Sequence, residues 1–106
     1  MHGYRYVELT GFPGTPTADS LTGLAAWTDG AETGTFTTND PLVNQLQHNI
    51  VWGARSNMLS IPTDCPQRDE RVGWTGDLQV FAPTASFLYD VLGMLTGWLT
   101  DVALEQ

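Results

Sequence analysis

The chain has 106 residues, of which 42% are hydrophobic and 10% aromatic, which by length alone predicts one complete small domain. Twelve acidic residues against four arginines give a formal net charge of −8 at pH 7. This excess of acid disfavours a nucleic-acid partner, because phosphate neutralisation needs a basic surface. The longest apolar stretch, Phe87–Leu99, is interrupted by Asp90 and two glycines and falls short of the roughly 20 residues that span a bilayer, so we expect no membrane association.

The first 38 residues carry the signals of β-strands. Tyr4–Thr10 is rich in aromatic and β-branched residues and precedes a turn sequence at residues 11–14, which predicts a strand and its exit. Alternating apolar residues predict a second strand over residues 21–28, and a short third one is expected around residues 35–37. The Thr- and Gly-rich run from 29 to 38 marks a change of composition, and we expect a boundary between two architectures there.

The pattern becomes helical after residue 39. Asp40 is a suitable N-cap and Pro41 suits the first helical position, where no backbone donor is lost. Apolar residues at three- and four-residue steps then predict an amphipathic helix from Pro41 to about Ser56. A second helix is predicted from Asp77, itself a possible cap, and a third after a break near Asp90.

Residues 57–76 separate these helices with prolines, glycines and many polar side chains, which indicates a long irregular loop of the kind that often carries function. The fourteen residues from Asp64 to Asp77 hold four carboxylates, two guanidinium groups and one indole. Such a set suits a sugar site, because carboxylates and arginine bind vicinal hydroxyls, an indole stacks on a pyranose, and one carboxyl can act as a general acid.

Three other interpretations of this loop are open. A calcium site fits poorly, because the spacing departs from known calcium loops and Arg68 and Arg71 would oppose a divalent cation, so we expect no metal or cofactor. An arginine–carboxylate network could simply fix the loop. A nucleophilic pair of Cys65 and His48 is the weakest, since nothing in the sequence activates the thiol. Trp74 is the one indole expected at a ligand, whereas the other three tryptophans are expected in the core.

The residues from Ile61 to Asp77, IPTDCPQRDERVGWTGD, closely resemble the signature of bacterial α-L-rhamnosidases of glycoside hydrolase family 78. By this resemblance residues 1–38, beginning with the stretch from His2 to Glu8, are the C-terminal part of a β-sandwich domain. Residues 39–106 would be the N-terminal part of an (α/α)6-barrel catalytic domain of the six-hairpin glycosidase type. The implied fold class is therefore a mixed fragment, the end of a β-sandwich followed by the first helices of the barrel.

The resemblance also implies a reaction, the inverting hydrolysis of terminal, non-reducing α-L-rhamnose from a rhamnose-containing glycoside or oligosaccharide. Glu70 matches the general acid, which protonates the leaving oxygen. Three residues match positions that bind the sugar: Asp64, Trp74 and Asp77. Three more are expected to support them: Arg68, Asp69 and Arg71.

No residue matches the general base, which the family supplies from a later part of the barrel. We therefore expect a fragment that is inactive alone and requires the rest of the catalytic domain. A non-catalytic carbohydrate-binding module that uses the same acidic loop is the main alternative, and a short interaction protein is a third. The cellular location is left open, because the sequence has no secretory signal pattern and its lone cysteine says nothing of redox compartment.

Overall fold

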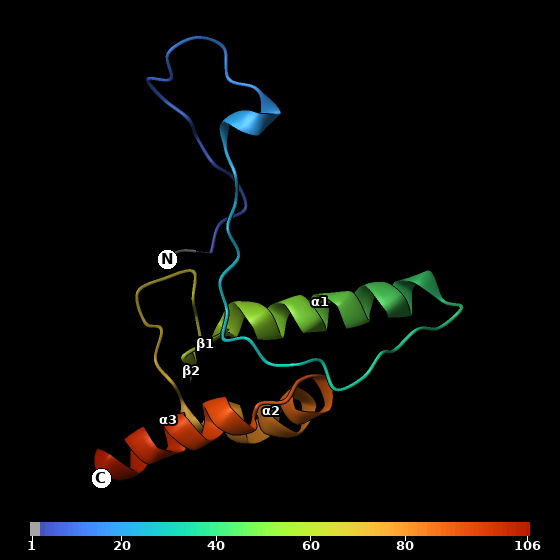
Figure 1. Cartoon of the computed structure of the whole chain (residues 1–106), viewed down its shortest axis with the longest axis vertical. Coiled ribbons are helices and arrows are strands. Elements are labelled where there is room, and N and C mark those ends of the chain that lie inside the picture. The colour runs from blue at the N-terminus through green and yellow to red at the C-terminus, as the bar shows by residue number, and fades with distance from the viewer. Residues whose placement is uncertain (1–2) are drawn as a thin grey trace.

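The computed structural model describes residues 3–106 as a helical unit from which an extended N-terminal arm projects (Figure 1). The radius of gyration is 17.1 Å, compared with about 13 Å for a compact domain of this length. None of the helices in residues 3–106 is long and apolar enough to cross a membrane. The elements in chain order are the 3-10 helix η1 (Ala18–Ser20), α1 (Pro41–Asn57), β1 (Met58–Leu59), β2 (Ile61–Pro62), α2 (Thr75–Leu88) and α3 (Leu92–Leu104).

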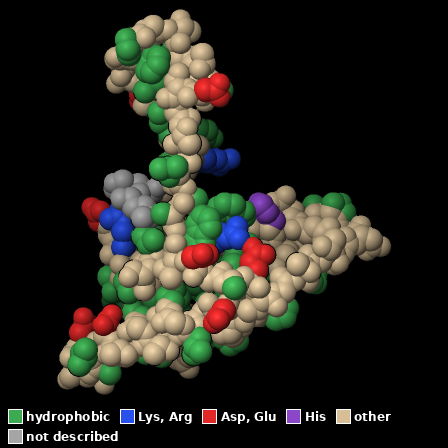
Figure 2. Space-filling model, viewed as in Figure 1, with side chains coloured by type: hydrophobic (Ala, Val, Ile, Leu, Met, Phe, Trp, Pro, Cys, Tyr) green, Lys and Arg blue, Asp and Glu red, His purple; other side chains and the backbone are tan. Residues whose placement is uncertain are grey.

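The predicted β-sandwich end is wrong. Residues 3–38 form no strand, although an isolated antiparallel bridge joins Glu32 to Tyr89, and the described fold is helical, with the two-residue strands β1 and β2 as its only strand pair. Residues 1–2, where the predicted segment begins, lie outside the described part. A strand needs a neighbour to satisfy its backbone, and the arm has none, so alternating residues such as Tyr6 and Leu24 are 82% and 87% exposed. Figure 2 shows hydrophobic side chains on the surface of this arm, away from the helical unit.

Helix α1 confirms the predicted start signal. The side chain of Asp40 accepts a hydrogen bond of 2.8 Å from the backbone N–H of Leu42, and Pro41 occupies the first turn. Just before the helix, the backbone N–H of Thr38 donates to Asn44 Oδ1 at 2.8 Å, while Asn44 Nδ2 donates back to the Thr38 carbonyl at 2.9 Å. These bonds fix the direction in which the chain enters α1.

Helices α1, α2 and α3 share one small core. Ala85 of α2 is completely buried, and α2 begins at Thr75, two residues before the predicted cap Asp77. The predicted break near Asp90 is confirmed, because α2 ends at Leu88 and α3 begins at Leu92. The buried residues of the core cluster are Ala54, Met58, Ala85, Leu88, Tyr89 and Val91.

Residues 27–33, here called the crossing segment, connect this core to the arm. The Thr28 backbone N–H donates to the carbonyl of Met58 at 2.8 Å, which joins the segment to β1. Further along, the Asp90 N–H donates to the carbonyl of Ala31 at 2.8 Å, and Thr33 N–H donates to that of Leu88 at 3.0 Å. The segment therefore spans from the β1 strand to the connection between α2 and α3.

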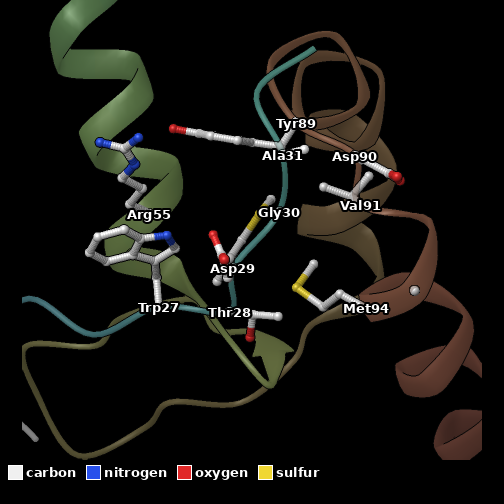
Figure 3. Close-up of a pocket in the computed structure, with 12 residues that line it drawn as sticks. Trp27, Thr28, Asp29, Gly30, Ala31, Arg55, Tyr89, Asp90, Val91 and Met94 are labelled. Atoms are coloured by element: carbon white, nitrogen blue, oxygen red, sulfur yellow. The ribbon is translucent and has the colours of Figure 1, made fainter.

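A single cation fixes the crossing segment against α1. The guanidinium carbon of Arg55 lies 5.1 Å from the ring centroids of both Trp27 and Trp52 and 5.7 Å from that of Tyr89. Its Nη2 lies 2.6 Å from Oε1 of Glu32. Figure 3 shows Arg55 beside Trp27 and Tyr89 in the pocket under the segment. Trp27 and Trp52, expected in the core, instead enclose a charge.

Replacing Asp40 with alanine should loosen the first turn of α1. Loss of an N-cap acceptor costs about 1 kcal/mol, which corresponds to a roughly fivefold larger equilibrium constant for opening of the turn. Amide hydrogen exchange of residues 42–44, followed by NMR, measures this directly. Asp40→Asn keeps a side-chain acceptor and is the matched control; equal exchange in wild type and Asp40→Ala would contradict the capping role.

Candidate active site

The acidic loop, residues 63–74, runs from the end of β2 to the start of α2 and folds back on itself. Its two ends are joined by hydrogen bonds, from the Val72 N–H to Asp64 Oδ1 at 2.8 Å and from the Asp64 N–H to the Val72 carbonyl at 3.2 Å. Between them, Arg71 has a left-handed backbone with φ of 52°, and its Nε donates to the carbonyl of Pro66 at 3.1 Å. The loop thus has a defined shape despite its lack of helix or strand.

Glu70 lies at the centre of the charged side chains. Arg68 Nη2 is 3.1 Å from one carboxylate oxygen, Oε2, and Trp74 Nε1 donates to the other oxygen, Oε1, at 3.2 Å. The Glu70 side chain is 34% exposed, so its carboxylate is held by two partners and still reaches the surface. These contacts bring together the predicted general acid, one predicted sugar-binding residue and one predicted supporting residue.

Asp64 also contacts this group. Although burial opposes ionisation, hydrogen bonds from the backbone N–H groups of Cys65 and Val72 and from the side chain of Glu70 lower the pKa of Asp64 from 3.8 to about 2. Asp64 is therefore favoured as the ionised carboxylate. An ionised acceptor next to a second carboxyl is the arrangement by which a site separates acid and base functions.

The remaining predicted residues lie further out. Asp77 is exposed in the first turn of α2, where it lines with Asp64 a groove of about 380 Å³ between α1, the β1–β2 pair and α2. Asp69 is fully exposed and pairs with Arg71, whose Nη1 lies 3.4 Å from Asp69 Oδ1. The groove walls are apolar, with Leu78 at their buried edge. The loop thus presents a charged face around Glu70, and beside it lies an apolar groove that Asp64 and Asp77 help to line.

The structure also bears on the nucleophile and metal-site interpretations of the loop. Burial raises the pKa of the Cys65 thiol, an effect that nearby Arg68 reduces, so the thiolate needed for nucleophilic attack is disfavoured. His48 lies on α1 with its ring 6.2 Å from that of Trp52. Ligand atoms of Asp64, Cys65 and Glu70 lie within 4.8 Å of one another, but the guanidinium of Arg68 already occupies the Glu70 carboxylate and would repel a metal ion.

Sequence reasoning missed one residue beside the loop, Trp98 of α3, which it assigned only to the core. Trp98 is 5% exposed and lies directly against Gly73, so close that a Cβ on this glycine would be 2.6 Å from the indole nitrogen. The glycine preceding Trp74 is the only local signal of this contact. Nothing in the sequence indicates which distant side chain fills the space.

The chain is similar to known proteins over its whole length. Residues 31–106 match the model of the bacterial alpha-L-rhamnosidase six-hairpin glycosidase domain. Over the whole chain, an alpha-L-rhamnosidase of Streptomyces avermitilis is 54% identical and one of Formosa agariphila 50% identical. The predicted boundary at 38/39 stays a prediction.

Solved structures give the same result. The chain superposes on the crystal structure of Streptomyces avermitilis alpha-L-rhamnosidase complexed with L-rhamnose with a TM-score of 0.91, 55% identity and 94% of this chain covered. The alpha-L-rhamnosidase from Dictyoglumus thermophilum gives a TM-score of 0.83 and 45% identity over 88% of this chain.

The helices and the acidic loop therefore correspond to part of a six-hairpin glycosidase domain. More particularly, the chain belongs to the bacterial α-L-rhamnosidase family, as the sequence motif predicts. It spans about a tenth of the length of the relatives it matches: 10% of the Streptomyces and 12% of the Formosa protein, and 10% of each solved chain described above.

Acid should open the loop at the Asp64–Val72 closure. A carboxylate whose pKa is lower in the folded state contributes stability that is complete above its unfolded value, 3.8, and lost as the pH falls towards 2. We expect the NMR signal of the Asp64 carboxyl carbon to titrate near pH 2 and the Val72 amide to lose protection in the same range. Asp64→Asn should abolish this pH dependence. A carboxyl that titrates near 3.8 would contradict the closure.

Proposed function

We propose that this chain supplies the acid side of the active site of an inverting α-L-rhamnosidase, with Glu70 as the general acid. The observation that carries the proposal is the contact of Glu70 with Arg68, Trp74 and Asp64 within one closed loop. After Glu70 gives up a proton, the guanidinium and the indole N–H would stabilise the carboxylate that forms.

The same loop suits recognition of a deoxy sugar. Asp64 and Asp77 offer carboxylate oxygens to hydroxyl groups along the groove, and the indole of Trp74, half exposed, offers an apolar face to the ring. The solved relative from Streptomyces avermitilis is complexed with L-rhamnose, which supports a terminal α-L-rhamnoside as the substrate. Asp69 and Arg71 would act indirectly, by holding the turn that carries Glu70.

Inversion requires a second carboxylate that activates water about 6.5–9.5 Å from the acid. Glu105, the only glutamate after Glu70, lies at the C-cap of α3 and is exposed, so it offers no enclosed position opposite a sugar. We infer that the base comes from another part of a larger catalytic domain. The chain's coverage of only a tenth of its relatives supports this inference.

The proposal is testable in a chimera in which this chain replaces the matching 106 residues of the Streptomyces avermitilis enzyme. Glu70→Gln in the chimera should lower kcat/KM about 100-fold or more on phenyl α-L-rhamnoside, whose leaving group needs a proton. The loss on 2,4-dinitrophenyl α-L-rhamnoside should be much smaller, because that leaving group departs as an anion. Steady-state kinetics with both substrates measure the difference.

The control is Glu8→Gln, a change at an exposed glutamate of the arm, which should leave both rates unchanged. Equal losses on the two substrates would contradict the role of Glu70 as general acid. A chimera that folds and binds rhamnose yet hydrolyses neither substrate would instead favour a non-catalytic carbohydrate-binding function for the loop.

The 106-residue chain alone should not hydrolyse p-nitrophenyl α-L-rhamnoside, since inverting chemistry cannot proceed without a base. Release of p-nitrophenol above the rate of the Glu70→Gln chain would place the base within these 106 residues. The two chains are matched in length and charge pattern except at residue 70, so a contaminating activity would appear equally in both.

A further inference from the structure

Gly73 lies at the junction between the acidic loop and α2. On one side, Val72 is joined to Asp64 by the two hydrogen bonds that close the loop. On the other side, Trp74 is the N-cap of α2, and its carbonyl accepts a hydrogen bond of 3.1 Å from the Leu78 N–H. A displacement of Gly73 would therefore move both the closure and the indole that contacts Glu70.

Trp98 fixes the position of this glycine from the opposite side. A Cβ on Gly73 would lie 2.6 Å from Trp98 Nε1, 3.1 Å from Cε2 and 3.4 Å from Cζ2. Real Cβ atoms do not approach other atoms as closely as the first of these distances. The backbone thus lies on the indole itself, in space that only a glycine permits. Because Trp98 is buried on α3, it cannot swing aside as a flexible surface side chain would.

We propose that Trp98 is a positioning residue for the general acid, acting through Gly73 and Trp74. The chain of contacts runs from Trp98 to the Gly73 backbone, then through the covalently adjacent Trp74 to Oε1 of Glu70. Trp98 is not among the residues that line the groove of Asp64 and Asp77. This inference rests on the proposed function of Glu70. It adds the residue that orients the Glu70 carboxyl group.

The test uses the chimera described above and a pair of changes at this contact. Gly73→Ala should lower kcat on phenyl α-L-rhamnoside about tenfold or more, because a misplacement of about 1 Å at a reacting group can cost 100-fold. The loss should be smaller on 2,4-dinitrophenyl α-L-rhamnoside, which does not need the acid. Gly76→Ala, two residues into α2 where a new Cβ meets nothing within 4 Å, is the matched control and should behave as wild type.

The second change makes the test specific for Trp98. Trp98→Phe provides a smaller ring that lacks Nε1, so it should create space for the alanine and restore activity on the phenyl substrate when combined with Gly73→Ala. A merely structural contact predicts equal losses on both substrates, whereas the positioning role predicts a loss and a rescue concentrated on the phenyl substrate. Thermal unfolding of each chimera shows whether the variant is folded at the assay temperature.

The outcomes separate this inference from the function on which it rests. If Glu70→Gln shows no dependence on the leaving group, the assignment of the acid is wrong. If Glu70→Gln shows this dependence but Gly73→Ala is within twofold of wild type, or is not rescued by Trp98→Phe, only the positioning role of Trp98 is wrong.

Discussion

The two hydrogen bonds between Asp64 and Val72 are the constraint on which the candidate site depends. They join residues eight positions apart, so that the intervening chain must turn sharply and carry its charged side chains on one small surface. The bond to the Asp64 carboxylate is also charge-assisted, which makes it stronger than an ordinary backbone pair. Without this closure, Glu70 and Trp74 would be held only by their mutual contact and by Arg68, all on a mobile segment.

The charges of the loop are arranged in separate pairs. Arg68 neutralises Glu70, and Arg71 pairs with the exposed Asp69 while also donating to the backbone at Pro66. Within residues 3–106 Asp64 forms no ion pair of this kind, and hydrogen bonds from backbone N–H groups and from the Glu70 side chain lower its pKa. A chain with four basic residues and a net charge of −8 thus commits two of its arginines to a single loop. These local contacts, and not the overall acidity, set the electrostatic environment of each carboxyl group.

Local patterns predicted the parts of the structure that depend on local forces. The cap at Asp40 and the break near Asp90 both involve residues close in sequence, where spacing determines geometry. The arm was mispredicted because alternation reports a potential strand but not whether a partner exists. The packing of Trp98 on Gly73 was missed because 25 residues separate them in the sequence, and only the tertiary fold brings them together.

The crossing segment, residues 27–33, has a consequence for how the chain folds. It precedes α1 in the sequence, yet its hydrogen-bond partners include the carbonyl of Leu88 and the N–H of Asp90, more than 50 residues later. Loop-closure entropy makes such distant pairings late events. During synthesis this segment leaves the ribosome first but has no complete partner until both α2 and the following turn have emerged. It must therefore wait, unpaired, and then complete the helical unit as one of its last parts.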